Sequence, residues 1–353
     1  MSTTIDRTLS LDEALALAND HHQAGRFADA LAIYQAVLER APDCAPAQIN
    51  MGALLLLHGN FADGWPAFAW RRHGQQGQLA VWNGRPLDGR GILIRGEQGA
   101  GDNIQFLRYV ADVESLGGRP VVLTLPGMKR LFAGLAGGAH IVEPGDQVSD
   151  LACEVPVMDL PGLLGTTAET IPAEVPYLSA EPALVAEWRE RLGPARGPRI
   201  GLCWQGNPDK PRDHLRSIPL ARFEALFGLA GSHWFGLQVG PGEDQAAAFA
   251  DHQSFTHLGA ALGESPDKFV DTAAVIANLD LVISVDTAIA HLAGAMAKPV
   301  WVLLPFVPDW RWMLERTDSP WYPTARLFRQ PAPGDWDTPL GQLAAAMETM
   351  PNS

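Results

Sequence analysis

The chain has 353 residues, of which 47% are hydrophobic and 19% charged, and its formal net charge at pH 7 is −14. This composition is typical of a globular protein long enough for two or three domains, and the acidic average field disfavours nucleic acid and anionic membranes as partners. The three cysteines have no C-x-x-C spacing, and no basic leader or long apolar run occurs, so we expect a cytoplasmic protein without disulfides, structural zinc, signal peptide or membrane-spanning helix.

Residues 1–75 contain a repeat of 34 residues. The tripeptide Gly-Arg-Phe at 25–27 recurs as Gly-Asn-Phe at 59–61. This period, and the segment AGRFADALAIYQAVLERAP, resemble the tetratricopeptide repeat, in which two packed helices are joined by a tight turn. About two units are present, and such units cannot bury their apolar faces alone, so we expect the second to pack on the domain that follows. We interpret the repeats as a groove for a protein or peptide. A packing cap and the contact of a homo-oligomer stay open as alternatives.

From about residue 90 the pattern alternates between strands and helices, which is typical of parallel α/β domains. We place an N-terminal domain at 76–180 and a C-terminal domain at 181–353. We expect strands at 92–96, 121–125, 140–144, 154–160, 199–204, 233–239, 255–259, 281–285 and 300–304, and helices near 102–117, 127–136, 218–229, 267–278 and 287–297. Two such domains put a cleft between the carboxyl edges of their sheets, where ligands bind.

The segment RGEQGAGDNIQF, residues 95–106, joins the first of these strands to a helix. Its Gly96, Gly99 and Gly101 predict a narrow turn in which backbone approaches a ligand closely. The order G-x-x-G-x-G differs from the dinucleotide fingerprint G-x-G-x-x-G, and the next residue, Asp102, would repel a phosphate. Asp102 is therefore either a helix cap or a functional acid, and these residues alone do not decide between the two roles.

The C-terminal domain contributes two candidate loops. Residues 203–220 gather basic and amide side chains beside a strand end, which favours an anionic ligand, although a solvated loop has the same composition. In the second loop a strand runs through Asp286 into a helix whose first N–H groups, near Thr287 and Ala288, can bind a phosphate. His291 lies one turn further along the same face.

Two segments, ILIRGEQGAGDNIQFLRY and DLVISVDTAIAHLAGAMAKPVWVLLPFVPDWRW, resemble bacterial tetratricopeptide-repeat proteins with a glycosyltransferase domain. That domain is similar to the ADP-heptose lipopolysaccharide heptosyltransferases of glycosyltransferase family nine. The resemblance runs from the first repeat to about residue 330. It implies a GT-B fold, in which two Rossmann-like domains face a cleft, and transfer of a sugar from a nucleotide-activated donor without a metal or other cofactor.

The resemblance also implies roles for particular residues. Asp102 matches the acid of the family's Gly-Asp motif, the general base, with the three glycines shaping the acceptor side. Asp286, Thr287 and His291 match a motif that faces the donor's sugar and diphosphate, and Ala288 replaces the family's glycine there, which leaves the donor's identity open. The remaining donor contacts, from the loop at 205–217, are Gln205, Asn207, Arg216 and Ser217, with Arg216 supplying the charge.

We therefore expect an inverting, metal-independent glycosyltransferase whose repeats present a protein acceptor, such as flagellin or another surface protein. Its one D-x-D sequence, Asp335-Trp-Asp337, precedes the final helix and is interpreted as a turn and cap. A transferase fold used only as a scaffold or protein-binding module, and an enzyme acting on a lipid or glycan, are the alternatives.

Overall fold

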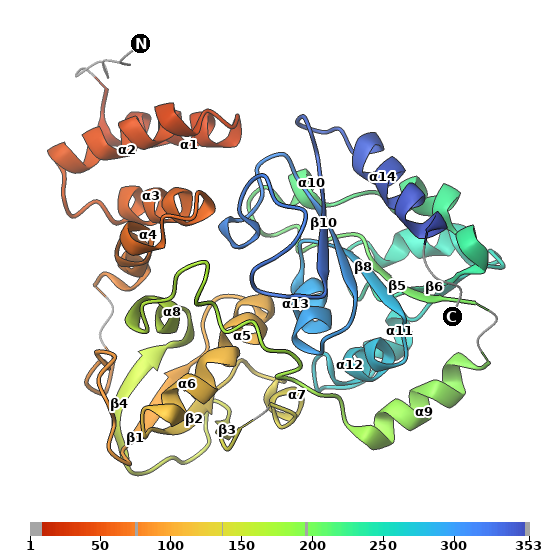
Figure 1. Ribbon diagram of the computed structural model, residues 1–353, viewed down its shortest axis with the longest axis horizontal. Coiled ribbons are helices and arrows are strands. Elements are labelled where there is room, and N and C mark those ends of the chain that lie inside the picture. The colour runs from red at the N-terminus through yellow and green to blue at the C-terminus, as the bar shows by residue number, and fades with distance from the viewer. Residues whose placement is uncertain (1–8, 75–76, 136, 195–196, 350–353) are drawn as a thin grey trace.

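The computed structural model describes residues 9–74, 77–135, 137–194 and 197–349 (Figure 1). A helical segment at the N-terminus is followed by two α/β units, each built on a parallel sheet, as expected from the sequence. In Figure 1 the sheet of β1–β4 lies below the helical segment, and the sheet of β5–β10 lies to the right of both. None of the described helices is long and apolar enough to span a bilayer.

The N-terminal segment is a pair of helical hairpins. Its helices are α1 (Leu11–Gln23), α2 (Phe27–Arg40), α3 (Ala45–Leu57) and α4 (Phe61–Phe68). Helix α3 begins 34 residues after α1, at residue 45 against residue 11. Helix α4 likewise begins 34 residues after α2, at residue 61 against residue 27. Gly25 and Gly59 turn the chain between paired helices with φ of +72° and +78°, a region that favours glycine. Assignment of the hairpins to the tetratricopeptide class stays a prediction.

The second hairpin packs on the rest of the chain, as expected from its apolar face. The Trp65 indole donates to the carbonyl of Thr166 at 2.8 Å, and its ring meets Trp310 edge to face at 5.3 Å between centroids. Phe68 also packs on Trp310, at 5.5 Å. The hairpin therefore shares a hydrophobic core with both α/β units.

The first sheet has four parallel strands in the order β3-β2-β1-β4. The strands are β1 (Gly91–Arg95), β2 (Arg119–Leu123), β3 (His140–Val142) and β4 (Leu151–Pro156). Its helices are α5 (Ala100–Phe106), α6 (Val110–Ser115), α7 (Lys129–Phe132) and α8 (Leu160–Leu163), with α9 (Pro182–Leu192) leading to the second unit. The strand expected over 154–160 ends at Pro156, because proline cannot donate to a ladder, and a 3₁₀ turn follows at Val157–Asp159.

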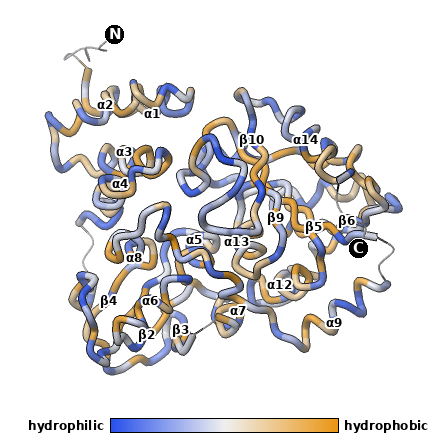
Figure 2. Tube along the Cα trace, viewed as in Figure 1, coloured by the Kyte–Doolittle hydropathy of each residue, from blue (hydrophilic) through white to orange (hydrophobic). Residues whose placement is uncertain are grey.

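The second sheet has six parallel strands in the order β10-β9-β8-β5-β6-β7. The strands are β5 (Arg199–Cys203), β6 (His233–Gly236), β7 (Phe255–His257), β8 (Leu281–Val285), β9 (Val300–Leu304) and β10 (Ala325–Arg329). This is the doubly wound order, and its direction reverses between β5 and β8, where such sheets bind ligands. Figure 2 shows hydrophobic residues along its central strands, which are buried on both faces.

The helices of the second unit are shorter than the sequence predicts. They are α10 (Asp213–Arg216), α11 (Gly259–Leu262), α12 (Val270–Ala277), α13 (Ala288–Ala295) and α14 (Asp337–Glu348). The helix expected near 218–229 is a 3₁₀ helix over Leu220–Leu226, because Pro219 and Gly228 bracket it and leave room for only two turns. Strand β10 was not predicted. The domain boundaries at 75 and 180 stay predictions.

A buried arginine joins the two α/β units. Arg108 donates to the carbonyl of Trp321 at 2.6 Å and to the hydroxyl of Tyr177 at 3.1 Å. Its guanidinium also lies 4.7 Å from the ring centroid of Tyr322. Carbonyls, a phenol and aromatic faces thus satisfy a charge that would otherwise be costly to bury.

We expect Trp65→Ala to lower the free energy of unfolding by about 3–5 kcal/mol, the usual cost of removing a buried tryptophan. The loss should be visible as a lower denaturant midpoint. Leu17→Ala, at a residue of the same segment that is 38% exposed, is the control and should change the midpoint little. Equal effects of the two substitutions would mean that the Trp65–Trp310 contact does not fix the hairpin to the body.

Candidate functional site

The carboxyl ends of β1 and β8 lead into two helices that pack against each other, α5 and α13. The contact is close at Gly101, where a Cβ atom would lie 2.9 Å from Cδ2 of His291 and 3.4 Å from Cα of Ala288. Glycine is therefore required for this packing, because any larger residue would displace the histidine ring. The predicted acceptor-side and donor-side motifs thus meet at one place.

The three glycines of the first motif differ in position. Gly96 and Gly99 lie in the turn after β1, with Gly99 as the N-cap of α5. Gly101, expected in the turn, lies instead in the first turn of α5. The space beside it is filled by α13. The proximity of these glycines to an acceptor stays a prediction.

Asp102 is the third residue of α5 and both of its carboxylate oxygens have partners. Oδ2 accepts the N–H of Gly99 at 2.8 Å, so the side chain caps the helix from inside its first turn. Oδ1 pairs with Nη2 of Arg311, which belongs to the loop after β9. The carboxylate is 19% exposed and thus lies at the boundary of the two α/β units. Its role as a base stays a prediction.

Arg311 is a site residue that the sequence interpretation missed. Its Nε donates to Oε1 of Gln105 at 2.6 Å, and its Nη1 pairs with Oδ1 of Asp309 at 2.9 Å. The motif Pro-Asp-Trp-Arg-Trp at 308–312 was part of the resemblance, but no residue in it was given a function. An arginine between two tryptophans in an acidic chain was the signal that could have identified it.

Arg216 follows β5 and Asp286 follows β8, the two strands between which the strand order of the second sheet reverses. A contact between these two residues joins the loops that follow the two strands. Nη1 of Arg216 donates to the carbonyl of Asp286 at 2.8 Å, while its Nε pairs with Oδ1 of the buried Asp213 at 2.8 Å. Burial and the neighbouring Asp309 carboxylate raise the pKa of Asp286 to about 6, against the opposing effect of Arg216. The site thus holds a carboxyl group that titrates near neutrality.

His291 is buried on the same face of α13. Its Nδ1 lies 2.9 Å from the hydroxyl of Tyr322, and its ring stacks on Trp312 at 5.4 Å between centroids. Burial, together with the charge of Arg311, lowers the pKa of His291 well below its usual range. The imidazole is therefore neutral at pH 7, and it can accept or donate a single hydrogen bond on its free nitrogen.

The first turn of α13 is organised by Thr287. Its hydroxyl caps the helix by accepting the N–H of Ile289 at 3.3 Å and lies 3.0 Å from the hydroxyl of Ser284. Ala288 follows as the first helical residue, half-buried against α5. The N–H of Ala290 donates to the carbonyl of Thr287 at 3.1 Å, so the N–H of Ala288 and the positive end of the helix dipole are what this turn offers to a ligand. This end of α13 can therefore bind an anion.

The loop after β5 supplies the remaining predicted donor residues, and it brings only some of them to α13. Ser217 is tied to Arg216 through Asp213, whose Oδ2 accepts its hydroxyl at 2.8 Å. Gln205 bonds to Gln245 and Gln238 at the base of the loop. Asn207 is exposed and closes a local turn by accepting the N–H of Asp209, so the structure does not bring it into this group.

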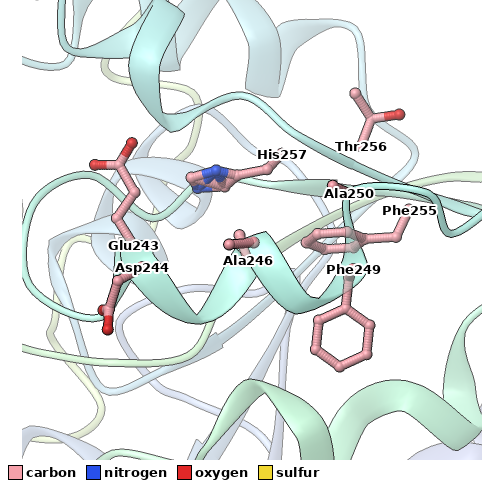
Figure 3. Close-up of a pocket in the computed structure, with 9 residues that line it drawn as sticks. Glu243, Asp244, Ala246, Phe249, Ala250, Phe255, Thr256 and His257 are labelled. Atoms are coloured by element: carbon pink, nitrogen blue, oxygen red, sulfur yellow. The ribbon is translucent and has the colours of Figure 1, made fainter.

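Two hollows lie on the second unit near these residues. One of about 630 Å³ is bordered by Gln205, Ser217, Gln245 and the loop 208–214. The other, of about 690 Å³, lies between the 3₁₀ helix Glu243–Phe249 and strand β7, with Glu243 and His257 at one end and Phe249 and Phe255 at the other (Figure 3). No predicted site residue borders the second hollow.

No cluster of three or more His, Cys, Asp or Glu residues suited to a metal ion occurs in the described part of the chain. In the D-x-D sequence, Asp335 accepts from the N–H and hydroxyl of Thr338, at 3.1 and 2.7 Å, and Asp337 pairs with Arg222. Asp335 thus closes a turn at the start of α14, whereas Asp337 forms an ion pair and the N-cap residue, Trp336, makes no side-chain capping bond.

Residues 265–303, which include Asp286 and His291, match the sequence model of glycosyltransferase family 9 (heptosyltransferase). The chain is also 29% identical over 383 aligned positions to Protein FlbA of Caulobacter vibrioides, and the match covers 95% of this chain and 63% of FlbA. The chain therefore spans less than two thirds of the length of that relative.

Among solved structures, the glycosyl transferase family 9 protein from Veillonella parvula is similar to this chain with a TM-score of 0.50 and 10% identity. The match covers 76% of this chain and 92% of that protein. ADP-heptose lps heptosyltransferase II of E. coli is similar with a TM-score of 0.45 and 14% identity, over 73% of this chain and 98% of that one. The likeness to the Veillonella protein shows the fold, two parallel α/β units like those of GT-B enzymes.

We expect Asp286→Asn to become more stable relative to the parent protein as the pH rises from about 4 to 7. Because the pKa of Asp286 is raised to about 6 in the folded state, the folded protein binds this proton more tightly than the unfolded chain does. The carboxyl group's contribution to stability therefore falls as the pH rises through this window, and asparagine lacks that loss. Denaturant melts of both proteins at several pH values test this, and a constant difference would contradict it.

Proposed function

We propose that the chain is a metal-independent, inverting glycosyltransferase that moves a sugar from a nucleotide-activated donor to an acceptor. The observation that carries this proposal is the contact of α5 with α13. It sets an acidic residue of one unit beside the anion-binding end of a helix of the other. The match of residues 265–303 to glycosyltransferase family 9 supports the same activity.

In this reaction Asp102 takes the proton of the acceptor hydroxyl as its oxygen attacks the anomeric carbon from the face opposite the leaving group. The nucleoside diphosphate leaves with the bonding electron pair. The N–H groups of α13, near Thr287 and Ala288, together with Arg216, stabilise the charge that develops on its oxygens. Asp286 and the neutral His291 contact the sugar, whose hydroxyl groups are suited to hydrogen bonds with both.

The acceptor is a protein held by the helical hairpins, such as flagellin or another surface protein, and the reaction takes place in the cytoplasm. The hairpins pack directly on Trp310, beside Arg311 and thus near Asp102, which supports a role for them close to the site. The description of the matching family model, heptosyltransferase, makes a nucleotide-activated heptose the first donor to test.

A scaffold without activity is the second candidate. Two observations favour it: Ala288 stands in place of the family's glycine, and Asp102 is paired with Arg311. In that case the fold would bind a partner protein through its hairpins, without turnover. Donor binding separates the two candidates.

We expect a nucleoside diphosphate to raise the melting temperature, because a ligand that binds only the folded state stabilises it by RT ln(1 + [L]/Kd). At about 100 times Kd this amounts to about 2.7 kcal/mol. The shift should shrink in Arg216→Gln and persist in Lys129→Gln, which removes an exposed cation of α7 that is paired with Asp146. Absence of any shift with ADP, GDP or UDP and their sugars would remove the main support for a transferase.

We expect Asp102→Asn to bind the donor at least as tightly as the parent protein and to lose about 10²–10⁴-fold in transfer rate, because asparagine can still accept the Gly99 N–H but cannot take a proton. Product formation from donor and acceptor measures the rate, and a denaturant melt measures the fold. A rate near that of the parent protein, or a loss explained by reduced stability, would make Asp102 a structural residue.

A further inference from the structure

Arg311 is a cation held at the boundary of the two α/β units. It is 7% exposed, and its three nitrogens contact Asp102, Gln105 and Asp309. The guanidinium carbon lies 4.5 Å from the ring centroid of Trp310, the preceding residue in the loop. These three contacts fix the orientation of the Arg311 side chain. One of them joins it to Asp102, the predicted base, which belongs to the other α/β unit.

The position of Arg311 relative to α13 follows from its neighbours. Asp102 adjoins Gly101, which touches Ala288 and His291. On the other side Trp312 stacks on His291. The charge of Arg311 is felt by both Asp286 and His291, whose proton affinities it lowers. The guanidinium is therefore within electrostatic reach of the end of α13 that can bind an anion.

The loop that carries Arg311 is supported from outside by the helical hairpins. Gly25 lies against Phe306, where a Cβ atom would come within 2.9 Å of the ring, and Gly59 lies against Met313, where the distance would be 3.1 Å. Trp65 packs on Trp310 between them. Because the backbone on both sides of Arg311 is held, a change of partner at this residue is confined to its side chain.

We propose that Arg311 is shared between Asp102 and the donor's diphosphate, so that donor binding frees the base. Without donor the guanidinium neutralises Asp102. When a diphosphate occupies the N-terminal end of α13, one of its oxygens replaces Oδ1 of Asp102 as the partner of Nη2 of Arg311. The Asp102 oxygen is then free to accept the proton of the acceptor hydroxyl. This inference rests on the proposed function and adds the cation that a metal-free transfer requires.

The step balances with the groups named. The acceptor O–H bond breaks and its proton moves to Oδ1 of Asp102, while the acceptor oxygen forms a bond to the anomeric carbon. The bond from that carbon to the diphosphate oxygen breaks, and the electron pair stays on the diphosphate. Arg311, now paired with that oxygen, stabilises the added charge.

Exchange of Arg311 from a carboxylate to a diphosphate is chemically reasonable. The planar guanidinium binds carboxylate and phosphate oxygens through the same fork, and a diphosphate carries more negative charge than one carboxylate. Gln105 and Asp309 keep two of the nitrogens in place during the exchange. The cost of separating Asp102 from Arg311 is then part of the donor's binding free energy, and linkage makes this coupling reciprocal.

The test uses the full chain and measures binding of ADP, GDP, UDP and inorganic pyrophosphate by calorimetry. Reciprocity predicts that Asp102→Asn, which removes the competing carboxylate, binds the preferred diphosphate about fivefold or more tightly than the parent protein does. Arg311→Gln should bind it about tenfold or more weakly. In the double variant Asp102→Asn/Arg311→Gln the gain from Asp102→Asn should vanish, because the two residues act through one contact.

Two controls separate this coupling from general charge effects. Glu97→Gln removes a carboxylate of the same loop that pairs with Arg71 and not with Arg311, and it should not raise the affinity. Arg130→Gln removes another cation that bridges the two units, through Glu181 and Asp267, and should leave the affinity unchanged. If Arg311→Gln does not fold, Arg311→Lys keeps the charge without the fork and should show a smaller loss of the same sign.

Failure of the parent protein to bind any of the four probes would overturn the proposed function and this inference with it. Binding by the parent protein with no gain in Asp102→Asn would overturn the inference alone. A gain that persists in the double variant, or that Glu97→Gln reproduces, would do the same, since it would show a general effect of charge.

Discussion

The close contact of α5 with α13 is the constraint on which the site depends. It exists because residue 101 has no side chain, so that the first turn of one helix can rest against Ala288 and His291 of the other. The contact places the loop after β1 of the first sheet beside the loop after β8 of the second sheet. Arg108, buried among carbonyls and aromatic rings, holds the same two units together behind this contact. Without these contacts Asp102 and Asp286 would belong to unconnected surfaces.

Charges at the boundary are arranged in alternation. Asp102, Arg311 and Asp309 follow one another through direct pairs, and Arg216 holds the carbonyl of Asp286 on the far side. This series of pairs gives each charged side chain a partner of opposite charge or a carbonyl at a partly buried boundary. Burial, and next the Asp309 carboxylate, raise the pKa of Asp286, and the charges of Arg216 and Arg311 only partly oppose this.

The sequence predicted the order of elements well wherever one strand and one helix follow each other with clear periodicity. Strands β8 and β9 were placed with their observed bounds, because their apolar runs are bounded by Asp286 and by Pro299. Strand β10 was missed because Arg326 and Arg329 interrupt its apolar pattern. The two motifs of the site were identified, but Arg311 was not, since its importance comes from a contact between residues 209 positions apart. Spacing along one chain carries no information about such a contact.

The packing of Gly25, Gly59 and Trp65 on the segment 306–313 has a consequence for modularity. Repeat segments are often treated as exchangeable units that can be joined to any partner. Here the glycines of the helical turns lie directly against a loop of the second α/β unit, so an exchanged segment with larger residues at these turns would push that loop away from the boundary. A chimera that keeps the loop 305–313 together with its own hairpins should preserve the geometry, whereas one that divides them should not. The structural unit is therefore the hairpin pair with its loop, and a change in the hairpins reaches Arg311 at the boundary of the two α/β units.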